Sequence, residues 1–325
     1  MNSEAIGAGG GQGESPHYFK PDWREHYRGH LSPLYKRAIY AATRPLISWN
    51  ASRHLMRETL DLYRPDYVFV TRGWPLEWLR KLGSSLTNLS DATILVQGTG
   101  TGWDAITWAA LRPKRVIATD LFASPEAWEE IARFCRDTYG TRVDFHEAPL
   151  QDHRFLPDGS IDLCGSDAVF EHVKDFPEML AESFRVLKPG GSLYATYGPL
   201  WYSAAGDHYS TRGGLENVFN HVILSDDSYR AYFYKHLNRD EDWQGAARYY
   251  ELDLFSRLTT RQYLDHYRQA GFARRSLILF VSPEAVAFKK RFPERFRAIV
   301  RQMSGTLAPD DLVIAGNSIL LQKPE

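Results

Sequence analysis

A glycine-rich turn between an apolar run and a helical pattern is the most specific chemical feature of this 325-residue sequence. The apolar run ILVQ (94–97) is typical of a buried strand, and GTGTG (98–102) follows it directly. Glycine tolerates positive φ and lets a ligand approach the backbone, while the next helix presents unpaired N–H groups to an anion. The turn is therefore a candidate site for a carboxylate or a phosphate.

A carboxylate follows at the end of the next apolar run. Asp120 closes the run RVIATD (115–120), 18 residues after Gly102. Ligands of open α/β sheets bind at the carboxyl ends of the strands, where an aspartate can accept hydrogen bonds from both hydroxyls of a ribose. The alternative role for Asp120 is a helix cap or a turn.

Groups suited to proton transfer follow the fourth apolar run. Glu171 and His172 are adjacent there, and His208 and His221 lie farther along the chain. Histidine has an ordinary pKa near neutrality, so each of the three can act as a general base. His221 precedes a predicted helix start at Ser225, and we expect its imidazole to face the site. The alternative is that these histidines only pack or cap loops.

The elements that must position these residues alternate from residue 91 onward. Strand-like runs lie at 92–97, 115–120, 142–147, 161–166, 192–198, 273–281 and 311–322, with helical patterns between most of them. This alternation predicts βαβ units. We expect an α/β fold with a Rossmann-like, seven-stranded sheet, mostly parallel, whose last strand is antiparallel.

The segment FLPDGSIDLCGSDAVFEHVKDFPEMLAESFRVLKPGG (155–191) places a turn, a strand, a helix and a Pro-Gly-Gly turn in a fixed order. Together with the glycine turn and Asp120, residues 91–200 resemble the class I (Rossmann-like) S-adenosylmethionine-dependent methyltransferases. The stretch RVLKPGG (185–191) is especially characteristic of them, and residues 259–281 are similar more weakly. The resemblance implies an enzyme that uses S-adenosylmethionine.

The resemblance also implies roles for individual residues. The glycine turn would bind the methionine end of the cofactor through Gly98, Thr99, Gly100 and Gly102, and Asp120 would bind the ribose. The adenine would lie beside Leu121, Leu150 and Gln151. The sulfonium would lie beside Ser166 and Asp167. Val96 stands where many members carry an acidic residue that holds the methionine amino group. Gln97 or Asp104 would take over that role.

Two alternatives concern the cofactor. A nicotinamide enzyme is disfavoured because Trp103 occupies the position of the third glycine in its GxGxxG fingerprint. The Glu171-His172 pair and the later histidines resemble metal-using branches, namely small-RNA 2′-O-methyltransferases and ubiquinone-pathway O-methyltransferases. Those carry a further glutamate where this chain has Ala168, so a divalent metal is not favoured and no metal ligand is assigned.

We predict five regions. They are a disordered tail (1–16), a helical N-terminal extension (17–90), a cofactor-binding core (91–200), a substrate-cap insertion (201–258) and a completion of the core sheet with a helical insert (259–325). The insertion is rich in aromatic residues, which can wall a pocket or build a small core.

The predicted reaction is O-methylation of a small molecule or glycan. The alternatives are N-, C- or RNA methylation, or a non-catalytic interaction module.

The composition excludes several classes of protein. A formal net charge of −1 and scattered basic residues disfavour a nucleic-acid partner. Two cysteines indicate a reduced compartment, and the first 16 residues lack the pattern of a signal peptide. No apolar run reaches the length of about 18 residues that a membrane span needs. We therefore expect a soluble, cytoplasmic protein, and the oligomeric state stays open.

Overall fold

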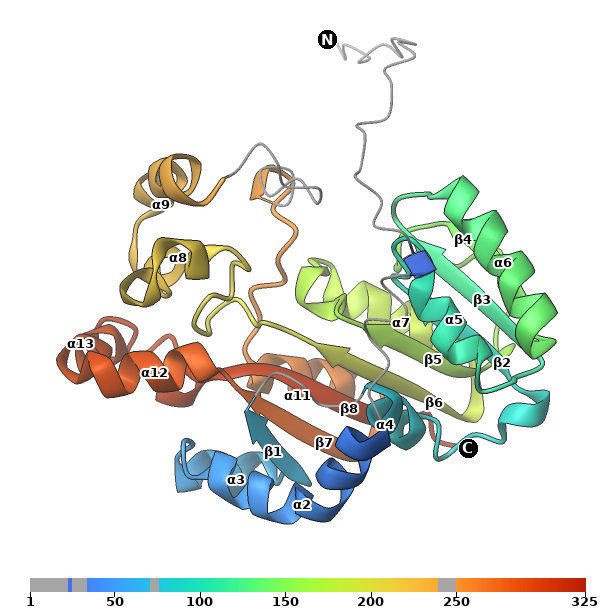
Figure 1. Cartoon of the computed structure of the whole chain (residues 1–325), viewed down its shortest axis with the longest axis horizontal. Coiled ribbons are helices and arrows are strands. Elements are labelled where there is room, and N and C mark those ends of the chain that lie inside the picture. Colours follow the sequence, from blue (N-terminus) through green and yellow to red (C-terminus); the bar gives the residue numbers. More distant parts are fainter. Residues whose placement is uncertain (1–22, 25–33, 71–75, 239–249) are drawn as a thin grey trace, which may run out of the picture.

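The computed structural model describes residues 23–24, 34–70, 76–238 and 250–325. The predicted tail (1–16) lies outside the described residues. Within these residues, one mixed sheet runs through the centre, with helices on both faces and a group of short helices at one end (Figure 1).

The sheet has eight strands in the order β1-β7-β8-β6-β5-β2-β3-β4. Their bounds are β1 Tyr67–Val70, β2 Thr93–Gln97, β3 Arg115–Asp120, β4 Arg142–Glu147, β5 Ile161–Asp167, β6 Leu187–Tyr197, β7 Ala273–Val281 and β8 Ile314–Gln322. Only β8 is antiparallel to its neighbours β6 and β7 within this sheet. The predicted Rossmann-like sheet with an antiparallel last strand is confirmed, with eight strands instead of seven.

The additional strand comes from the N-terminal extension, which was predicted to be helical. The extension supplies α2 (Leu34–Ser52), α3 (Arg57–Tyr63), β1 and α4 (Leu76–Gly83). β1 pairs in parallel with β7 at the sheet edge. Asp66, just before β1, donates its backbone N–H to the Leu277 carbonyl at 2.8 Å and accepts from the Leu277 N–H at 2.9 Å through its carboxylate. The extension therefore completes the sheet.

Two apolar cores lie on opposite faces of the sheet. Ile94 and Val96 belong to one core and Leu95 to the other, as the period-two alternation of a strand requires. The first face is covered by α4, α5 (Trp103–Ala109) and α6 (Pro125–Tyr139). The second is covered by α7 (Phe176–Val186) and α11 (Thr260–Gln269). Because β2 pairs in parallel with β3 and with β5, the loops at the carboxyl ends of these three strands lie at the same edge of the sheet.

The insertion after β6 forms a third, smaller aromatic core. Its short elements are η3 (Ser210–Gly213), η4 (Leu215–Asn217), α8 (Asn220–Ile223), α9 (Asp226–Tyr232) and the π-helical turn η5 (Phe233–Leu237). The buried members of this core are Trp201, Tyr209, Tyr229, Phe233, Leu237 and Phe255. Many of the insertion's aromatic residues therefore pack on one another.

Further helices follow β7 and precede β8. They are α12 (Pro283–Arg291), α13 (Pro293–Gln302) and the short η6 (Pro309–Leu312), and they lie in the region for which a helical insert was predicted. Cys135 and Cys164 are both free and buried. Among the described residues, no helix combines the length and apolar character that crossing a membrane requires.

Candidate active site

The glycine turn after β2 has the backbone geometry that its sequence predicts. Gly98 and Thr99 donate their N–H groups to the Thr119 carbonyl of β3 at 2.9 and 3.0 Å. Gly98 has φ +77°, and a Cβ there would lie 2.4 Å from the Val169 side chain. Gly100 has φ +53°, and a Cβ there would meet nothing within 4 Å. The turn is therefore tight at its start and open at Gly100.

Asp120 lies beside this open position. Its carboxylate accepts the Gly100 N–H at 2.6 Å and the Phe122 N–H at 3.0 Å. Burial raises the pKa of Asp120, and these backbone donors oppose that rise. Leu121 is 49% exposed beside it, whereas Leu150 is buried. The predicted ribose-binding and adenine-binding residues thus include one carboxylate that is held in place and one exposed apolar side chain.

A buried ion pair network that the sequence did not reveal lies behind the turn. Arg80 of α4 is 2% exposed and contacts Asp104 of α5 at 2.7 Å and Asp167 at the end of β5 at 2.8 Å. Tyr194 donates its hydroxyl to Asp167 at 3.3 Å. Burial raises the pKa of Asp104, although the guanidinium beside it opposes this. One guanidinium of the N-terminal extension thus contacts two carboxyl groups of the core.

Gln97 and Asp104, the two candidates for the role of the missing acidic residue at position 96, both bond to other side chains of the protein. Val96 is buried, and Gln97 donates its amide to Ser183 Oγ of α7 at 2.9 Å. Asp104 is paired with Arg80. Ser166, predicted to lie near the sulfonium, donates its hydroxyl to the Gln97 carbonyl at 2.9 Å. Ser166 therefore helps to connect β5 with β2.

Glu171, His172 and His208 come together at the carboxyl end of β5. One ligand-type atom from each lies within 4.8 Å of the others. Glu171 and His172 lie in η2 (Phe170–His172), whereas His208 comes from the insertion with φ +69°. The His172 and His208 ring centroids are 4.8 Å apart. Sequence reasoning named both histidines but could not place them in contact.

The three side chains of this cluster differ in hydrogen bonding. Glu171 is 2% exposed and neither of its carboxylate oxygens has a hydrogen-bond partner in regular geometry. Burial raises the pKa of Glu171 to about 8, and the backbone N–H groups of Glu171 and Gly198 oppose this rise. His172 donates Nδ1–H to the Leu254 carbonyl at 2.7 Å. The Nε2 of His208 is buried without a partner, and burial together with repulsion from neighbouring histidines lowers its pKa well below the ordinary value.

His221 is placed differently from the expectation. Its side chain is fully buried in the insertion, where Nε2 donates to the Trp201 carbonyl at 2.7 Å. Its ring centroid lies 5.2 Å from that of Trp201, and Nδ1 is 3.9 Å from an Asp207 oxygen. Burial lowers the pKa of His221, and Asp207 opposes this. His221 therefore supports the insertion from within instead of lining an exposed inner rim.

The chain after the insertion folds back onto the cluster. Ser256 donates its N–H to the Glu171 carbonyl at 2.8 Å, and Leu254 accepts from His172. Tyr263 of α11 donates its hydroxyl to the Phe170 carbonyl at 3.2 Å. The Phe255 ring centroid is 5.8 Å from that of His172 and 6.0 Å from that of His208. The cluster thus has an aromatic wall and a rigid support.

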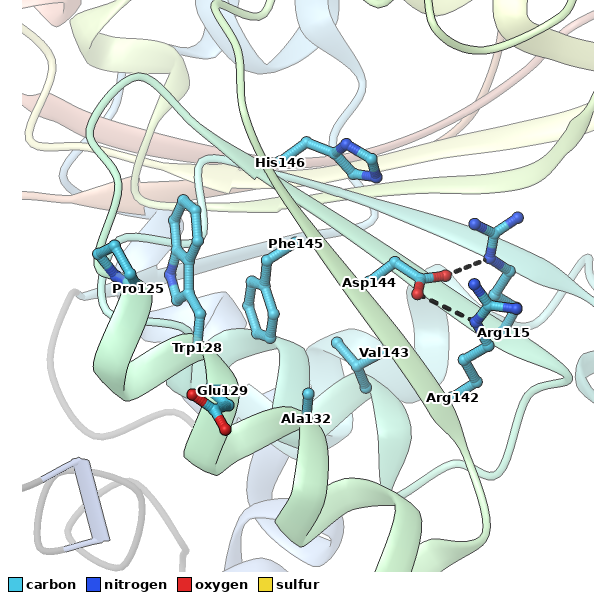
Figure 2. A pocket seen from close by; sticks show the side chains of 10 residues that line it. All are labelled: Arg115, Pro125, Trp128, Glu129, Ala132, Arg142, Val143, Asp144, Phe145 and His146. Atoms are coloured by element: carbon cyan, nitrogen blue, oxygen red, sulfur yellow. Dashed lines mark hydrogen bonds and ion pairs between the residues drawn. The ribbon is translucent and has the colours of Figure 1, made fainter.

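A shallow hollow between α6 and β4 is separate from these residues. Figure 2 shows Trp128 and Phe145 side by side on its wall and Asp144 bonded to Arg115 and Arg142. None of the predicted site residues lines it. Trp128 also donates its indole N–H to the Gly100 carbonyl at 2.9 Å. The hollow therefore shares Trp128 and Phe145 with the glycine turn, since a Cβ at Gly102 would lie 3.1 Å from the Phe145 ring.

Comparison with known proteins places the core in a family. Residues 95–195 match the family described as Methyltransferase domain. Ubiquinone/menaquinone biosynthesis C-methyltransferase UbiE of Geotalea daltonii is 31% identical over 141 residues, which are 42% of this chain and 60% of that protein. Malonyl-(acyl-carrier protein) O-methyltransferase of Yersinia pestis is 28% identical over 212 residues, which are 64% of this chain and 69% of that protein.

The solved structures to which this chain is similar include methyltransferases. Phosphoethanolamine N-methyltransferase 2 of Haemonchus contortus, in complex with S-adenosyl-L-methionine, has a TM-score of 0.46 and 16% identity, with 78% of this chain and 53% of that chain covered. Residues 95–195 are therefore identified as a methyltransferase domain of the class I, S-adenosylmethionine-dependent kind. The chain spans about 60% of the Geotalea daltonii relative, and the named relatives methylate different kinds of atom.

The residues at the glycine turn fit this cofactor. Gly100 leaves open space, and Asp120 presents carboxylate oxygens next to that space. The Thr99 hydroxyl is buried without a partner. Leu121 offers an exposed apolar surface for a flat ring. An anionic carboxylate, a ribose and an adenine are the groups that such a set of donors, acceptors and apolar surface can bind.

Proposed function

We propose that this protein transfers the methyl group of S-adenosylmethionine to a hydroxyl oxygen of a small molecule or glycan. The observation that carries the proposal is the meeting of Glu171, His172 and His208 at the carboxyl end of β5. This end of the strand carries Asp167, which the family resemblance associates with the sulfonium. A proton-accepting cluster beside the methyl donor is what an oxygen acceptor needs.

The reaction is a displacement in which the acceptor oxygen forms a bond to the methyl carbon. The carbon–sulfur bond breaks and its electron pair stays on sulfur. The hydroxyl proton must leave as well, because a neutral hydroxyl is a weak nucleophile and its alkoxide is scarce at neutral pH. The neutral imidazole of His172 or His208 accepts that proton, while the backbone of the glycine turn and Asp120 hold the donor. Holding the reactants in line supplies much of the remaining rate enhancement.

The cluster favours a hydroxyl over a carboxylate acceptor. The Yersinia pestis relative is named as a methyltransferase of malonyl-(acyl-carrier protein). A carboxylate is already ionised at neutral pH and needs no base. This chain gathers an acid and two imidazoles into one cluster. Phe255 lies beside the two imidazoles, and Trp201 packs on Phe255 with ring centroids 4.7 Å apart. Aromatic walls of this kind suit a sugar or an aromatic metabolite.

The proposal is tested with labelled S-adenosylmethionine and pools of metabolites and glycans, followed by mass spectrometry and NMR of the methylated product. We expect an O-methyl product. His208→Asn should lower turnover at least about tenfold, the lower part of what general acid–base catalysis contributes. Asparagine adopts positive φ readily, so it suits the left-handed backbone of residue 208.

Controls separate this result from unfolding. His54→Asn removes an imidazole outside the cluster and should leave turnover unchanged. Calorimetric titration with S-adenosylhomocysteine should give the same affinity for all three proteins. Methylation of nitrogen, carbon or RNA, or full activity in His208→Asn, would contradict the proposed reaction. A chain that binds no S-adenosylhomocysteine would favour a non-catalytic interaction module.

A further inference from the structure

We infer that Glu171, His172 and His208 bind a divalent transition-metal ion, with coordination positions left for a water molecule or the acceptor hydroxyl. The proposed metal site consists of these three side chains and does not depend on the proposed reaction. Its role in catalysis rests on the proposed function and specifies how the hydroxyl proton is made easier to remove.

The distances within the cluster allow one shared ion. Zn²⁺ and similar ions lie about 2.0–2.2 Å from histidine nitrogen and carboxylate oxygen. Two ligands of one ion are therefore separated by at most about 4.4 Å. The three candidate ligand atoms lie within 4.8 Å of one another. Small side-chain movements are sufficient for all three to contact one ion.

The hydrogen bonding of Glu171 points to an absent partner. Buried carboxylates are ordinarily paired with donors or with a cation. Neither oxygen of Glu171 has a cation or a side-chain donor as partner among the described residues, and only the backbone N–H groups of Glu171 and Gly198 act on it, although the side chain is almost completely buried. The Nε2 atom of His208 is buried and unpartnered in the same place. A cation between them would satisfy all of these atoms at once.

His172 has the outer hydrogen bond that is typical of a metal-binding histidine. Metal-binding histidines commonly donate their second ring N–H to a carbonyl or carboxylate, which fixes the tautomer and the ring orientation. The Leu254 carbonyl accepts this bond from Nδ1 at 2.7 Å. The lone pair of the neutral ring is then on Nε2. Ser256, two residues after Leu254, is bonded to the Glu171 backbone, so one segment supports both ligands.

The donor set selects the class of ion. Two imidazoles and one carboxylate suit zinc, iron, cobalt or manganese, whereas Mg²⁺ prefers oxygen ligands. Ala168 offers no ligand atom, so this cluster supplies three protein ligands. Three ligands with a remaining open position is the pattern of catalytic sites, because closed structural sites use four. Such an ion lowers the pKa of a bound hydroxyl.

The test is a titration of the full chain with Co²⁺ after dialysis against a chelator, followed by the visible absorption of bound cobalt. We expect one Co²⁺ per chain and displacement of Co²⁺ by Zn²⁺. Glu171→Gln keeps the shape of the side chain and removes its charge, and His208→Asn keeps the backbone conformation. Each should weaken Co²⁺ binding at least about tenfold, the lower bound for disturbed metal sites. His54→Asn should bind like the wild type.

The outcomes distinguish this inference from the proposed function. Absence of Co²⁺ binding, or equal binding by the wild type and both cluster variants, would overturn the metal site. Restoration of a chelated enzyme by Mg²⁺ alone would overturn the choice of a transition metal. S-adenosylhomocysteine titrated in parallel should bind all four proteins equally. If S-adenosylhomocysteine does not bind the wild type, the proposed methyltransferase function is contradicted. The Co²⁺ titration then still tests the metal site independently.

Discussion

Gly100 is the residue at which the glycine turn leaves room for a ligand. We expect Gly100→Val to weaken S-adenosylhomocysteine binding at least about tenfold, because the side chain would fill space beside Asp120 and force an unfavourable positive φ. Gly140 is a matched control, since it has φ +70° and a Cβ there also meets nothing within 4 Å. Gly140→Val should carry similar backbone strain and bind the ligand normally. Equal affinities, measured by calorimetry, would contradict the position of the cofactor.

The second prediction concerns the contribution of Asp120 to cofactor affinity. Asp120→Ala should weaken S-adenosylhomocysteine binding by about 1.5–3 kcal/mol, the range for hydrogen bonds that involve a charged group. Asp137→Ala changes an exposed carboxylate on α6 and is the control. The measurement is calorimetry on folded proteins whose thermal unfolding has been checked. Wild-type affinity in Asp120→Ala would contradict ribose binding by this residue.

His153 makes stability depend on pH. Burial lowers the pKa of His153 to about 4, and Glu182 opposes this while Arg185 adds to it. The unfolded chain binds a proton at the ordinary pKa of 6.5, so between pH 6.5 and 4 the unfolded state holds more protons at this position. The free energy of unfolding should therefore fall as the pH falls, by on the order of 1 kcal/mol per pH unit.

The variant His153→Gln tests this dependence. Urea unfolding at pH 7 and pH 5 should show a larger loss of stability for the wild type than for the variant. His146 and Asp152 also face His153 electrostatically and are unchanged in both proteins, so the difference isolates one imidazole. An equal loss in both would show that His153 is already accessible to protons in the folded state.

Site residues were predictable where the backbone itself demands a particular residue type. The glycine turn and Asp120 could be identified because positive φ and a strand-end carboxylate leave a local signature. The contact between Glu171 and His208 could not, because it depends on how the insertion folds back over β5. The role of Arg80 was missed for the same reason. Its helix has an ordinary basic surface pattern, and only the packing of α4 buries the guanidinium.

At the scale of elements, α4 is held to the core by charge as well as by apolar contact. Arg80→Met would leave Asp104 and Asp167 buried without their cation, which typically costs about 3–5 kcal/mol. Lys81→Met changes the next residue, which is exposed, and should have little effect. Urea unfolding measures both. The double variant Arg80→Met with Asp104→Asn should recover part of the loss, and no recovery would contradict the electrostatic explanation.

The strands differ in how far the sequence could reveal them. β2, β3 and β5 are apolar runs bounded by turns, and they precede helical patterns with caps and glycine stops, so their order follows from local signals. β1 has only four residues within a helical region, and its partner β7 is about two hundred residues away in the sequence. β1 forms a strand because it pairs with β7, and the hydrophobic periodicity of four residues does not predict such a long-range pairing.

At the scale of the whole molecule, the parts of the chain on either side of the family domain complete it. The extension provides the edge strand β1 (Figure 1) and Arg80. The insertion provides His208 and the aromatic wall. The domain itself supplies the glycine turn, Asp120, Glu171 and His172. We therefore propose that the domain binds the methyl donor and that its contact with the insertion carries the acceptor chemistry.

This arrangement predicts that residues 91–325 alone are not a functional unit. Without residues 1–90, β7 becomes an unpaired sheet edge at Ile278 to Val281, and Asp104 and Asp167 lose Arg80. We expect the shortened chain to aggregate, or to unfold at a clearly lower temperature, and to lose S-adenosylhomocysteine binding.

A milder change separates the contribution of the strand from that of the ion pair. Asp66→Ala removes the carboxylate that accepts from Ser276 and Leu277 while it leaves Arg80 in place. Exposed hydrogen bonds of this type are worth about 1 kcal/mol each, so we expect a small loss of stability with normal cofactor affinity. If the shortened chain binds S-adenosylhomocysteine as tightly as the full chain does, the extension is dispensable for the donor site. Arg80 would then act only in stability, since the glycine turn and Asp120 would keep their geometry without it.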